Sequence, residues 1–151
     1  MKKTEEKKVE KALESLLEML EIDTEYELNA LEEAIDITLT TDEGGILIGY
    51  HGETLDALQL IISLVLAKHL GRFVRVTLEI GDYKKARTQY LENLVKQSKE
   101  RALSENRAIV LPELKPWERR VIHLMLENDD EVSSQSSGEG RQRTLTILPK
   151  N

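Results

Sequence analysis

The sequence predicts an α+β protein made of two small domains, residues 1–81 and residues 82–151. Segments with apolar residues at every third or fourth position alternate with shorter segments in which every second residue is apolar, the patterns of amphipathic helices and half-buried strands. A length of 151 residues with 40% hydrophobic composition suits one domain or two small ones. The charge balance changes at Gly81–Asp82: 8 Lys and Arg oppose 17 Asp and Glu before it, and 13 oppose 11 after it.

The first half begins with an amphipathic helix over residues 5–21, followed by strands. The helix has apolar side chains on one face and Lys and Glu on the other; the apolar positions are Val9, Leu13, Leu16, Leu17 and Leu20. A strand is predicted over residues 33–41, where Ile, Ile and Leu alternate with Asp and Thr. A shorter strand is expected at about residues 25–29.

The segment GILIGYHGETLDAL, residues 45–58, leads into the second long helix. Its ILIG part is either a short helix or a buried strand, because four residues do not fix a period. From residue 53 to residue 70 the pattern is helical, and Gly71 is a natural stop. Apolar side chains cover more than half of the circumference of this helix, so we expect it to be buried on more than one side. The strand RFVRVTLEI, residues 72–80, completes the order α-β-β-α-α-β.

The second half is predicted to have the order α-β-α-β-β. A long polar helix is expected over residues 83–106 with a narrow apolar stripe, and AIVLPEL forms a short strand that ends at Pro112. Pro116 suits the first turn of a helix that runs to about residue 127. Two strands joined by a glycine-containing turn near residues 138–141 follow. The serine-rich segment 133–137 fits a strand flank or a mobile loop equally well.

Composition excludes several functional classes. The chain has no cysteine, which removes disulfides and thiolate metal sites and suits a reducing cytosol. No signal peptide is recognisable and the longest apolar run, LQLIISLVLA, is too short for a bilayer, so we expect a soluble, cytoplasmic protein without membrane insertion. His51, His69 and His123 lack metal-ligand spacing, and no P-loop or activated nucleophile is present. We therefore expect no catalytic residue, metal or cofactor.

The first candidate site is the pair Gly49 and Gly52, which frames Tyr50 and His51. Glycines at positions i and i+3 let a ligand approach the backbone without a Cβ in the way. The amides of residues 50–52 are expected at the N-terminus of the following helix, where unpaired N–H groups and the helix dipole favour a phosphate. No Lys or Arg occurs between Lys11 and Lys68, so such a contact would not use a cationic side chain.

The second candidate site lies on the helix WERRVIHLML. A helical wheel places Trp117, Val121, Leu124 and Met125 on one apolar face. Arg119 and His123 are four residues apart and point nearly opposite that face, so we expect them to be exposed together, with Arg120 on the flank. A guanidinium offers planar donors to phosphate and can stack on a base, and His adds a donor and a stacking surface.

The first motif resembles a type II KH domain over roughly residues 5–81. ILIGYHGETLDALQ follows a predicted strand, and the α-β-β-α-α-β order surrounds it. In that family a G-x-x-G loop joins two helices and clamps the backbone of about four unpaired nucleotides. The resemblance assigns this role to Gly49, Tyr50, His51 and Gly52. The two middle positions are often basic in the family and are Tyr and His here.

The second motif resembles the R-three-H domain over about residues 83–150. That domain is named for an Arg and a His separated by three residues, and KPWERRVIHLML is followed here by SSGEGRQRTLTIL. The resemblance ties the matching residues, Arg119 and His123, to single-stranded nucleic-acid binding. Arg141 and Arg143, near the predicted hairpin turn, are placed where they could extend a basic surface.

A KH domain followed by an R-three-H domain resembles the Jag family of bacterial proteins, also called SpoIIIJ-associated proteins. The resemblance implies a non-enzymatic protein that binds single-stranded RNA, or single-stranded DNA, and regulates gene expression post-transcriptionally in connection with cell envelope growth and division. It also implies that many members carry an additional N-terminal domain. The alternative is a protein-interaction module whose acidic KH half, through its strongly apolar helix 53–70, forms a homodimer or binds a small KH-domain partner.

Overall fold

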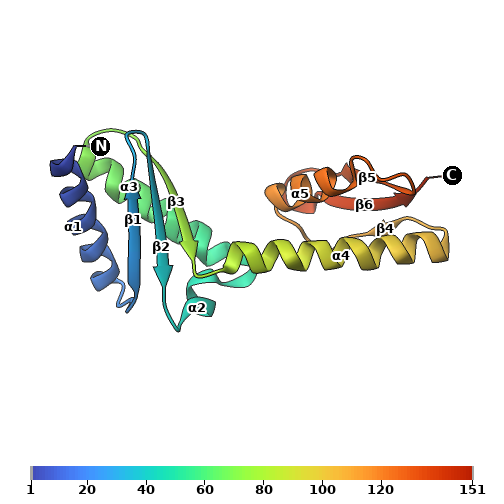
Figure 1. Cartoon of the computed structure of the whole chain (residues 1–151), viewed down its shortest axis with the longest axis horizontal. Helices are drawn as coiled ribbons and strands as arrows, with labels where there is room; N and C mark the ends of the chain where they lie inside the picture. The colour runs from blue at the N-terminus through green and yellow to red at the C-terminus, as the bar shows by residue number, and fades with distance from the viewer. Residues whose placement is uncertain (1, 151) are drawn as a thin grey trace. The chain divides into compact units, whose positions relative to one another are not determined.

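The computed structural model describes residues 2–150 and contains two compact units, one ending at Lys84 and the other beginning at Lys85 (Figure 1). Each mixes helices with a three-stranded sheet, which confirms the predicted α+β class with two small domains. We keep Gly81–Asp82 as the proposed domain boundary; it lies directly before helix α4 (Tyr83–Glu105).

The N-terminal unit has the predicted element order. It comprises α1 (Lys3–Met19), β1 (Glu25–Ala30), β2 (Ala34–Thr40), α2 (Gly44–Ile48), the 3-10 turn η1 (Tyr50–Gly52), α3 (Glu53–Leu70) and β3 (Arg75–Ile80). The sheet order is β1-β2-β3, with β1 antiparallel and β3 parallel to β2. The ILIG segment, for which the sequence left two alternatives, is helical through Ile48 in α2, and Gly49 follows the helix.

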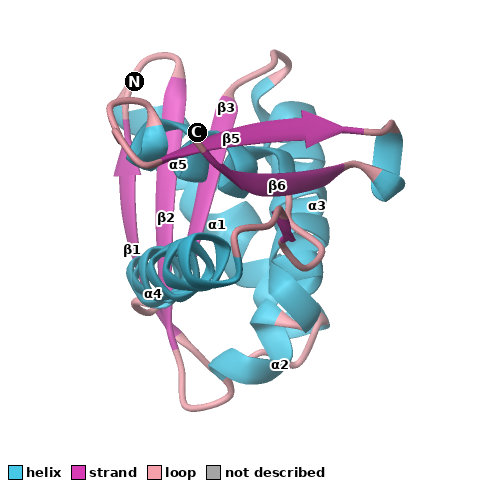
Figure 2. Cartoon of the chain, turned by 90° about the vertical axis from the view of Figure 1, so that its right-hand side faces the viewer, coloured by secondary structure: helices cyan, strands magenta, loops and turns pink. Residues whose placement is uncertain are grey.

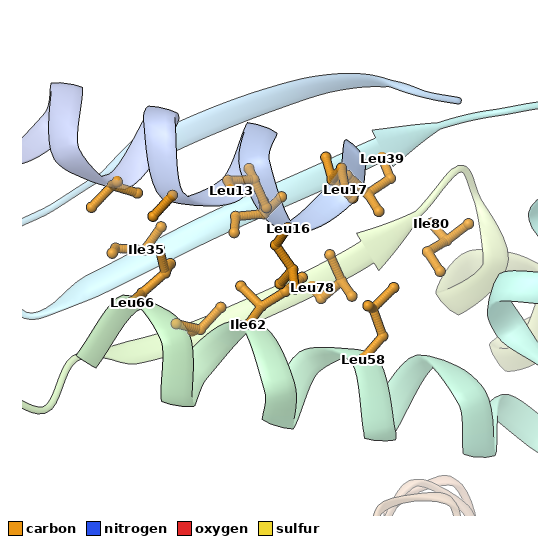
Figure 3. Close-up of a cluster of buried hydrophobic side chains, with 14 of the residues drawn as sticks. Leu13, Leu16, Leu17, Ile35, Leu39, Leu58, Ile62, Leu66, Leu78 and Ile80 are labelled. Carbon is orange, nitrogen blue, oxygen red and sulfur yellow. The ribbon is translucent and has the colours of Figure 1, made fainter. Parts of the chain in front are cut away.

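The core of this unit lies between the sheet and the two long helices. Figure 3 shows side chains of α1, α3, β2 and β3 pointing toward one another, among them Leu13, Ile35, Ile62 and Leu78. The alternating strand pattern is confirmed, because Ile35, Ile37 and Leu39 on β2 are all at most 1% exposed. Burying a side chain of this size contributes about 1.5–3 kcal/mol, so this face fixes the register of the strands.

Helix α3 corrects one sequence prediction, since it is buried along one side rather than several. Leu58, Ile62 and Leu66 face the core at 6% exposure or less. The apolar residues on its other side stay open to solvent: Leu60 is 60%, Ile61 43% and Leu64 63% exposed. The sheet covers only one face of the helix, and we call these three exposed residues the α3 apolar patch.

The C-terminal unit also follows the predicted order, with its hairpin at the end. After α4 come β4 (Ile109–Val110), α5 (Pro116–Leu126), β5 (Val132–Ser137), the 3-10 turn η2 (Gly140–Gln142) and β6 (Thr144–Pro149). The strands are antiparallel in the order β4-β6-β5. Figure 2 shows β5 and β6 as neighbours joined through the turn that contains η2. The serine-rich segment 133–137 therefore belongs to a strand, which decides between its two alternatives.

A second core joins α4, α5 and the sheet. Its buried side chains include Leu91 on α4, Ile122 on α5, and Leu145 and Ile147 on β6, all unexposed. Val132 begins β5 fully buried, so the residues two and four positions later on the same face, Ser134 and Ser136, also point toward α5. The strand register thus directs two serine hydroxyls at the helix that carries the R-x-x-x-H pair.

Candidate nucleic-acid interface

Helix α5 is fixed at its first turn by a buried carboxylate. Pro116 occupies the first helical position, and the backbone amide of Lys115 donates a hydrogen bond to Glu118 Oε2 at 2.8 Å. The other oxygen, Oε1, accepts a hydrogen bond from Arg87 Nε at 2.6 Å. Glu118 is fully buried. This ion pair ties α5 to α4 and sets the direction from which the following arginines project.

The buried face of α5 differs from the one that the helical wheel predicted. It consists of Glu118, Ile122 and Leu126, spaced four residues apart. Leu124, assigned to the inner face, is 60% exposed, and Trp117 is 36% exposed. The wheel placed only apolar residues inside, whereas here a charged residue is buried because Arg87, distant in sequence, neutralises it.

The prediction that Arg119 and His123 are exposed together opposite the core is also wrong. Both side chains are half-buried, on the flank of the buried face of α5. Arg119 Nη1 donates a hydrogen bond to the carbonyl of Leu114 at 2.6 Å. A guanidinium has five N–H donors, more than this one carbonyl can use. The side chain is therefore anchored at one end of its planar head. Arg120, the neighbour predicted on the flank, is exposed.

His123 is held between two serines of β5. Its Nδ1 lies 2.6 Å from Ser134 Oγ and its Nε2 lies 2.9 Å from Ser136 Oγ. A hydroxyl can donate or accept, so this arrangement satisfies either neutral tautomer. Both ring nitrogens have partners within the protein, which leaves the ring surface rather than an N–H as what His123 can offer a ligand.

These side chains surround one hollow of about 310 Å³, which we call the arginine hollow. Arg119, Arg120 and His123 come from α5, while Arg143 comes from the residue before β6. Leu124 and Ser136 complete its wall, together with Pro116. No carboxylate is among these residues, so three guanidinium groups share one recess with an exposed leucine and a fixed imidazole.

Arg141 is the one C-terminal candidate that does not line this hollow. It lies in η2 and is exposed, whereas Arg143, two residues later, enters the wall. Sequence reasoning also missed several residues. Ser134, Ser136 and the Glu118–Arg87 pair were not singled out, and Leu124 was assigned to the apolar face rather than to the site. The serines could have been found from SSQSS, because alternate residues of a strand next to the R-x-x-x-H helix face that helix.

The four loop candidates lie in the N-terminal unit between α2 and α3. Gly49 has φ 69° and ψ −169°, His51 has φ 49°, and Gly52 has φ 77°. The rings of Tyr50 and His51 stack at 4.1 Å between centroids with 10° between planes. Tyr50 is 66% exposed. The loop therefore presents an aromatic pair on an unusual backbone.

The surroundings of this loop are acidic. Asp42, Glu43, Glu53 and Asp56 lie in the segments next to it, and Glu43 and Glu53 are exposed. The amide of Gly52, expected to face a ligand, instead donates to the carbonyl of Gly49 at 3.4 Å. The loop thus differs from the expected phosphate cradle in its charge and in the use of one amide.

Metal binding and membrane spanning each require a recognisable arrangement of residues, and residues 2–150 contain neither arrangement. No group of three or more His, Asp or Glu side chains within this range is arranged to hold a metal ion. No helix in the same range has the length and hydropathy to span a bilayer.

Comparison with known proteins matches both units. Residues 6–80 match the family described as KhpA/KhpB, KH domain, and residues 89–149 match the R-three-H domain family. The chain is 36% identical over 146 residues to "RNA-binding protein KhpB" of Clostridium symbiosum, covering 93% of this chain and 66% of that protein. A protein of the same name from Bacillus subtilis is 26% identical over 140 residues, covering 91% of this chain and 67% of that protein.

The pneumococcal relative, also named "RNA-binding protein KhpB", is 27% identical over 135 residues, which is 89% of this chain and 41% of that protein. The chain thus spans between 41% and 67% of the length of these three relatives. The order of the two domains confirms the resemblance stated from the motifs. With both domains matched in this order and with relatives that align over most of its length, the chain belongs to the KhpB family, also called the Jag family.

Proposed function

We propose that this chain is a non-enzymatic, cytoplasmic protein that binds single-stranded RNA mainly through the arginine hollow. The observation that carries the proposal is the convergence of Arg119, Arg120 and Arg143 on one recess without a carboxylate in its wall. Guanidinium groups bind phosphate oxygens through two parallel hydrogen bonds. The exposed Leu124 and the ring of His123 offer apolar surface to an unpaired base. A base that is paired inside a duplex cannot reach this surface.

The GYHG loop is proposed as a second, weaker contact. Its stacked Tyr50 and His51 provide a platform on which a base can stack, and base–aromatic stacking contributes about 1–3 kcal/mol. The acidic residues around it oppose phosphate, so we assign the loop, Gly49 to Gly52, to bases rather than to backbone charge. Two modest contacts on one chain raise the overall affinity when one RNA strand reaches both.

The relatives bear the name RNA-binding protein, which supports RNA as the ligand class. We propose in addition, from the family resemblance, that the bound RNAs connect this chain to post-transcriptional control of cell envelope growth and division. Single-stranded DNA is a weaker candidate ligand for the same hollow. Arg141, exposed in η2, is proposed to add long-range attraction without contact in the hollow.

Arg119→Ala/Arg143→Ala is expected to lower the affinity for an unstructured RNA by at least about tenfold, because hydrogen bonds to charged groups contribute about 1.5–3 kcal/mol each. Fluorescence anisotropy with a labelled oligonucleotide over a series of salt concentrations measures this. The logarithm of the wild-type association constant should fall with the logarithm of salt with a slope of about −2 if three phosphates are neutralised.

The matched control is Arg101→Ala/Arg107→Ala, which removes the same charge from exposed arginines of the same unit. Equal losses in the two double variants would mean general attraction rather than a site, and would contradict the proposal. Tyr50→Asp/His51→Asp, tested in the same titration, should cost less than the arginine variant. A larger cost there would move the main contact to the GYHG loop.

A second candidate function is self-association through the α3 apolar patch. Leu60 and Leu64 lie one turn apart and, with Ile61, expose a continuous apolar strip on one side of α3. Contiguous exposed apolar surface of this kind is typical of protein contacts. We propose a second copy of this chain as the partner, since two identical strips are self-complementary; a small KH-domain protein is the alternative.

Light scattering coupled to gel filtration should then give a dimer mass that Leu60→Glu/Leu64→Glu reduces to a monomer mass. Two carboxylates on each strip would face two more across the two-fold axis without partners. Leu31→Glu, at another exposed leucine of the same unit, is the control and should leave the dimer intact. A monomeric wild-type chain at high concentration would contradict self-association.

A further inference from the structure

A second hollow adjoins the arginine hollow on α5 and β5. It measures about 350 Å³, within the range of small-ligand pockets of about 300–1,000 Å³. Leu126 and Glu127 from the end of α5, Ser133 and Ser134 from β5, and Lys150 form its wall, and we call it the Lys150 hollow. His123 and Leu124 line both hollows. The two recesses are therefore neighbours that share one wall.

The shared wall is held in place by the same two serines. Ser134 lines the Lys150 hollow and Ser136 lines the arginine hollow, and each binds one ring nitrogen of His123. A ring with both nitrogens bound resists rotation, so it separates the two recesses as a fixed partition. A strand of nucleic acid that crosses this wall would place successive units on its two sides.

The side chain of Lys150 is positioned by the turn that follows α5. Lys99 Nζ donates to Asp129 Oδ2 at 2.6 Å, and the amides of Glu131 and Val132 donate to Oδ1 at 2.9 and 3.0 Å. These hydrogen bonds, led by that from Lys99, lower the pKa of Asp129 to about 2. The carbonyl of Asp129 in turn accepts a hydrogen bond from Lys150 Nζ at 2.6 Å. The ordered turn after α5 thus places the ammonium group of Lys150.

The two hollows differ in charge, so we expect them to bind different parts of a ligand. Three guanidinium groups without a carboxylate suit a phosphate. The Lys150 hollow carries one ammonium and one carboxylate, together with serine hydroxyls and the exposed side chain of Leu124. A carboxylate repels phosphate but accepts hydrogen bonds from sugar hydroxyls and base amino groups. This wall therefore suits the uncharged part of a nucleotide.

We infer that the Lys150 hollow is a nucleoside subsite, which binds the sugar and base of the nucleotide next to the one whose phosphate occupies the arginine hollow. The inference rests on the proposed RNA-binding function and deepens it. Glu127 accepts from a ribose hydroxyl or an exocyclic amino group, and Leu124, which is 60% exposed, supports the base. The ammonium group of Lys150 has donors beyond the one that binds the Asp129 carbonyl, and we assign them to the phosphate that links the two units.

Amide chemical shifts of the labelled full chain test this with two ligands, adenosine 5′-monophosphate and the 5′-phosphorylated adenosine dinucleotide. The mononucleotide should shift resonances around the arginine hollow, such as those of Arg119 and Arg143. The dinucleotide should shift these and also Glu127 and Ser133. Dinucleotide shifts confined to the arginine hollow would overturn the subsite while leaving RNA binding intact. No shifts with either ligand would instead contradict the proposed function.

Glu127→Gln tests the inference through the direction in which dinucleotide affinity changes. If Glu127 accepts from a nucleoside, this variant should lower dinucleotide affinity by about fivefold, roughly the difference between a hydrogen bond to a charged acceptor and one to the neutral amide oxygen of glutamine, and leave mononucleotide affinity unchanged. If phosphate occupied the Lys150 hollow, removing the carboxylate charge would raise dinucleotide affinity, and the subsite would be overturned. Glu113→Gln, which removes one exposed carboxylate before α5, is the control for net charge.

Discussion

Glu118→Ala is expected to lower the free energy of unfolding of the C-terminal unit by about 3–5 kcal/mol, the usual cost of removing one partner of a buried ion pair. The carboxylate is fully buried and serves two donors, Arg87 Nε and the amide of Lys115. Its removal leaves the guanidinium of Arg87, whose side chain is 12% exposed, without this anion. It also leaves a small cavity at the start of α5.

Urea denaturation followed by tryptophan fluorescence isolates this effect. Trp117 is the single tryptophan of the chain and lies in the first turn of α5, so its emission reports on the C-terminal unit alone. Glu113→Ala, at an exposed glutamate of the preceding loop, should change stability by no more than about 0.5 kcal/mol. A loss below about 1 kcal/mol for Glu118→Ala would contradict a structural role for the pair.

A double-mutant cycle separates the pair from the other contacts of its members. Arg87→Ala leaves the Glu118 carboxylate buried without its cation, so we expect a large loss there as well. Arg87→Ala/Glu118→Ala should be markedly less destabilised than the sum of the single variants, with a coupling of about 1–3 kcal/mol. Additive losses would show that the two side chains stabilise the unit independently.

The sequence predicted those elements whose pattern reports directly on a buried face. Alternation on β2 and β3 was sufficient, because strand side chains have a period of two and only one face of this sheet meets the core. The stop of α3 at Gly71 was also readable, since that residue has φ 68° and ends the helix locally. In each case a few neighbouring residues contain the necessary information.

Predictions that depended on partners distant in sequence were wrong. The wheel for α5 had no means of placing Glu118 inside, because its neutralising partner Arg87 belongs to another helix, 31 residues away. Likewise, hydrophobicity gave the extent of the apolar surface on α3 but not which side the sheet covers. Leu60 and Leu64 resemble core residues in the sequence and are exposed in the structure.

The sequence predicted several residues of the candidate site, but not which of them meet in one hollow. Arg119 and His123 follow from one helical repeat, whereas their meeting with Arg143 depends on how the β5–β6 hairpin folds back beside α5. The serines that fix His123 depend on the same register, which directs alternate residues of SSQSS toward the helix. Strand register is a tertiary property, so the spacing between these residues in sequence did not contain it.

Gly49→Ala is expected to destabilise the N-terminal unit by roughly 2–4 kcal/mol, which combines backbone strain with overpacking. Gly49 has φ 69° and ψ −169°, a region that is essentially restricted to glycine. An added Cβ would also lie 2.8 Å from Thr54 Cβ and would clash with Thr54 Oγ1, in the first turn of α3. The methyl group therefore has no space unless η1 moves away from α3.

Gly45→Ala is the matched control, since that glycine lies within α2 and a Cβ there meets nothing within 4 Å. Alanine in a helix is favoured over glycine by about 0.5–1 kcal/mol, so this variant should be neutral or slightly stabilising. Urea denaturation followed by far-ultraviolet circular dichroism, together with RNA affinity, distinguishes two reasons for the glycine. If Gly49 serves helix packing, stability falls and α3 frays at its start. If it serves only the close approach of a ligand, stability is unchanged and RNA affinity alone falls. That result would contradict the packing role and would make Gly49 part of the RNA-binding surface.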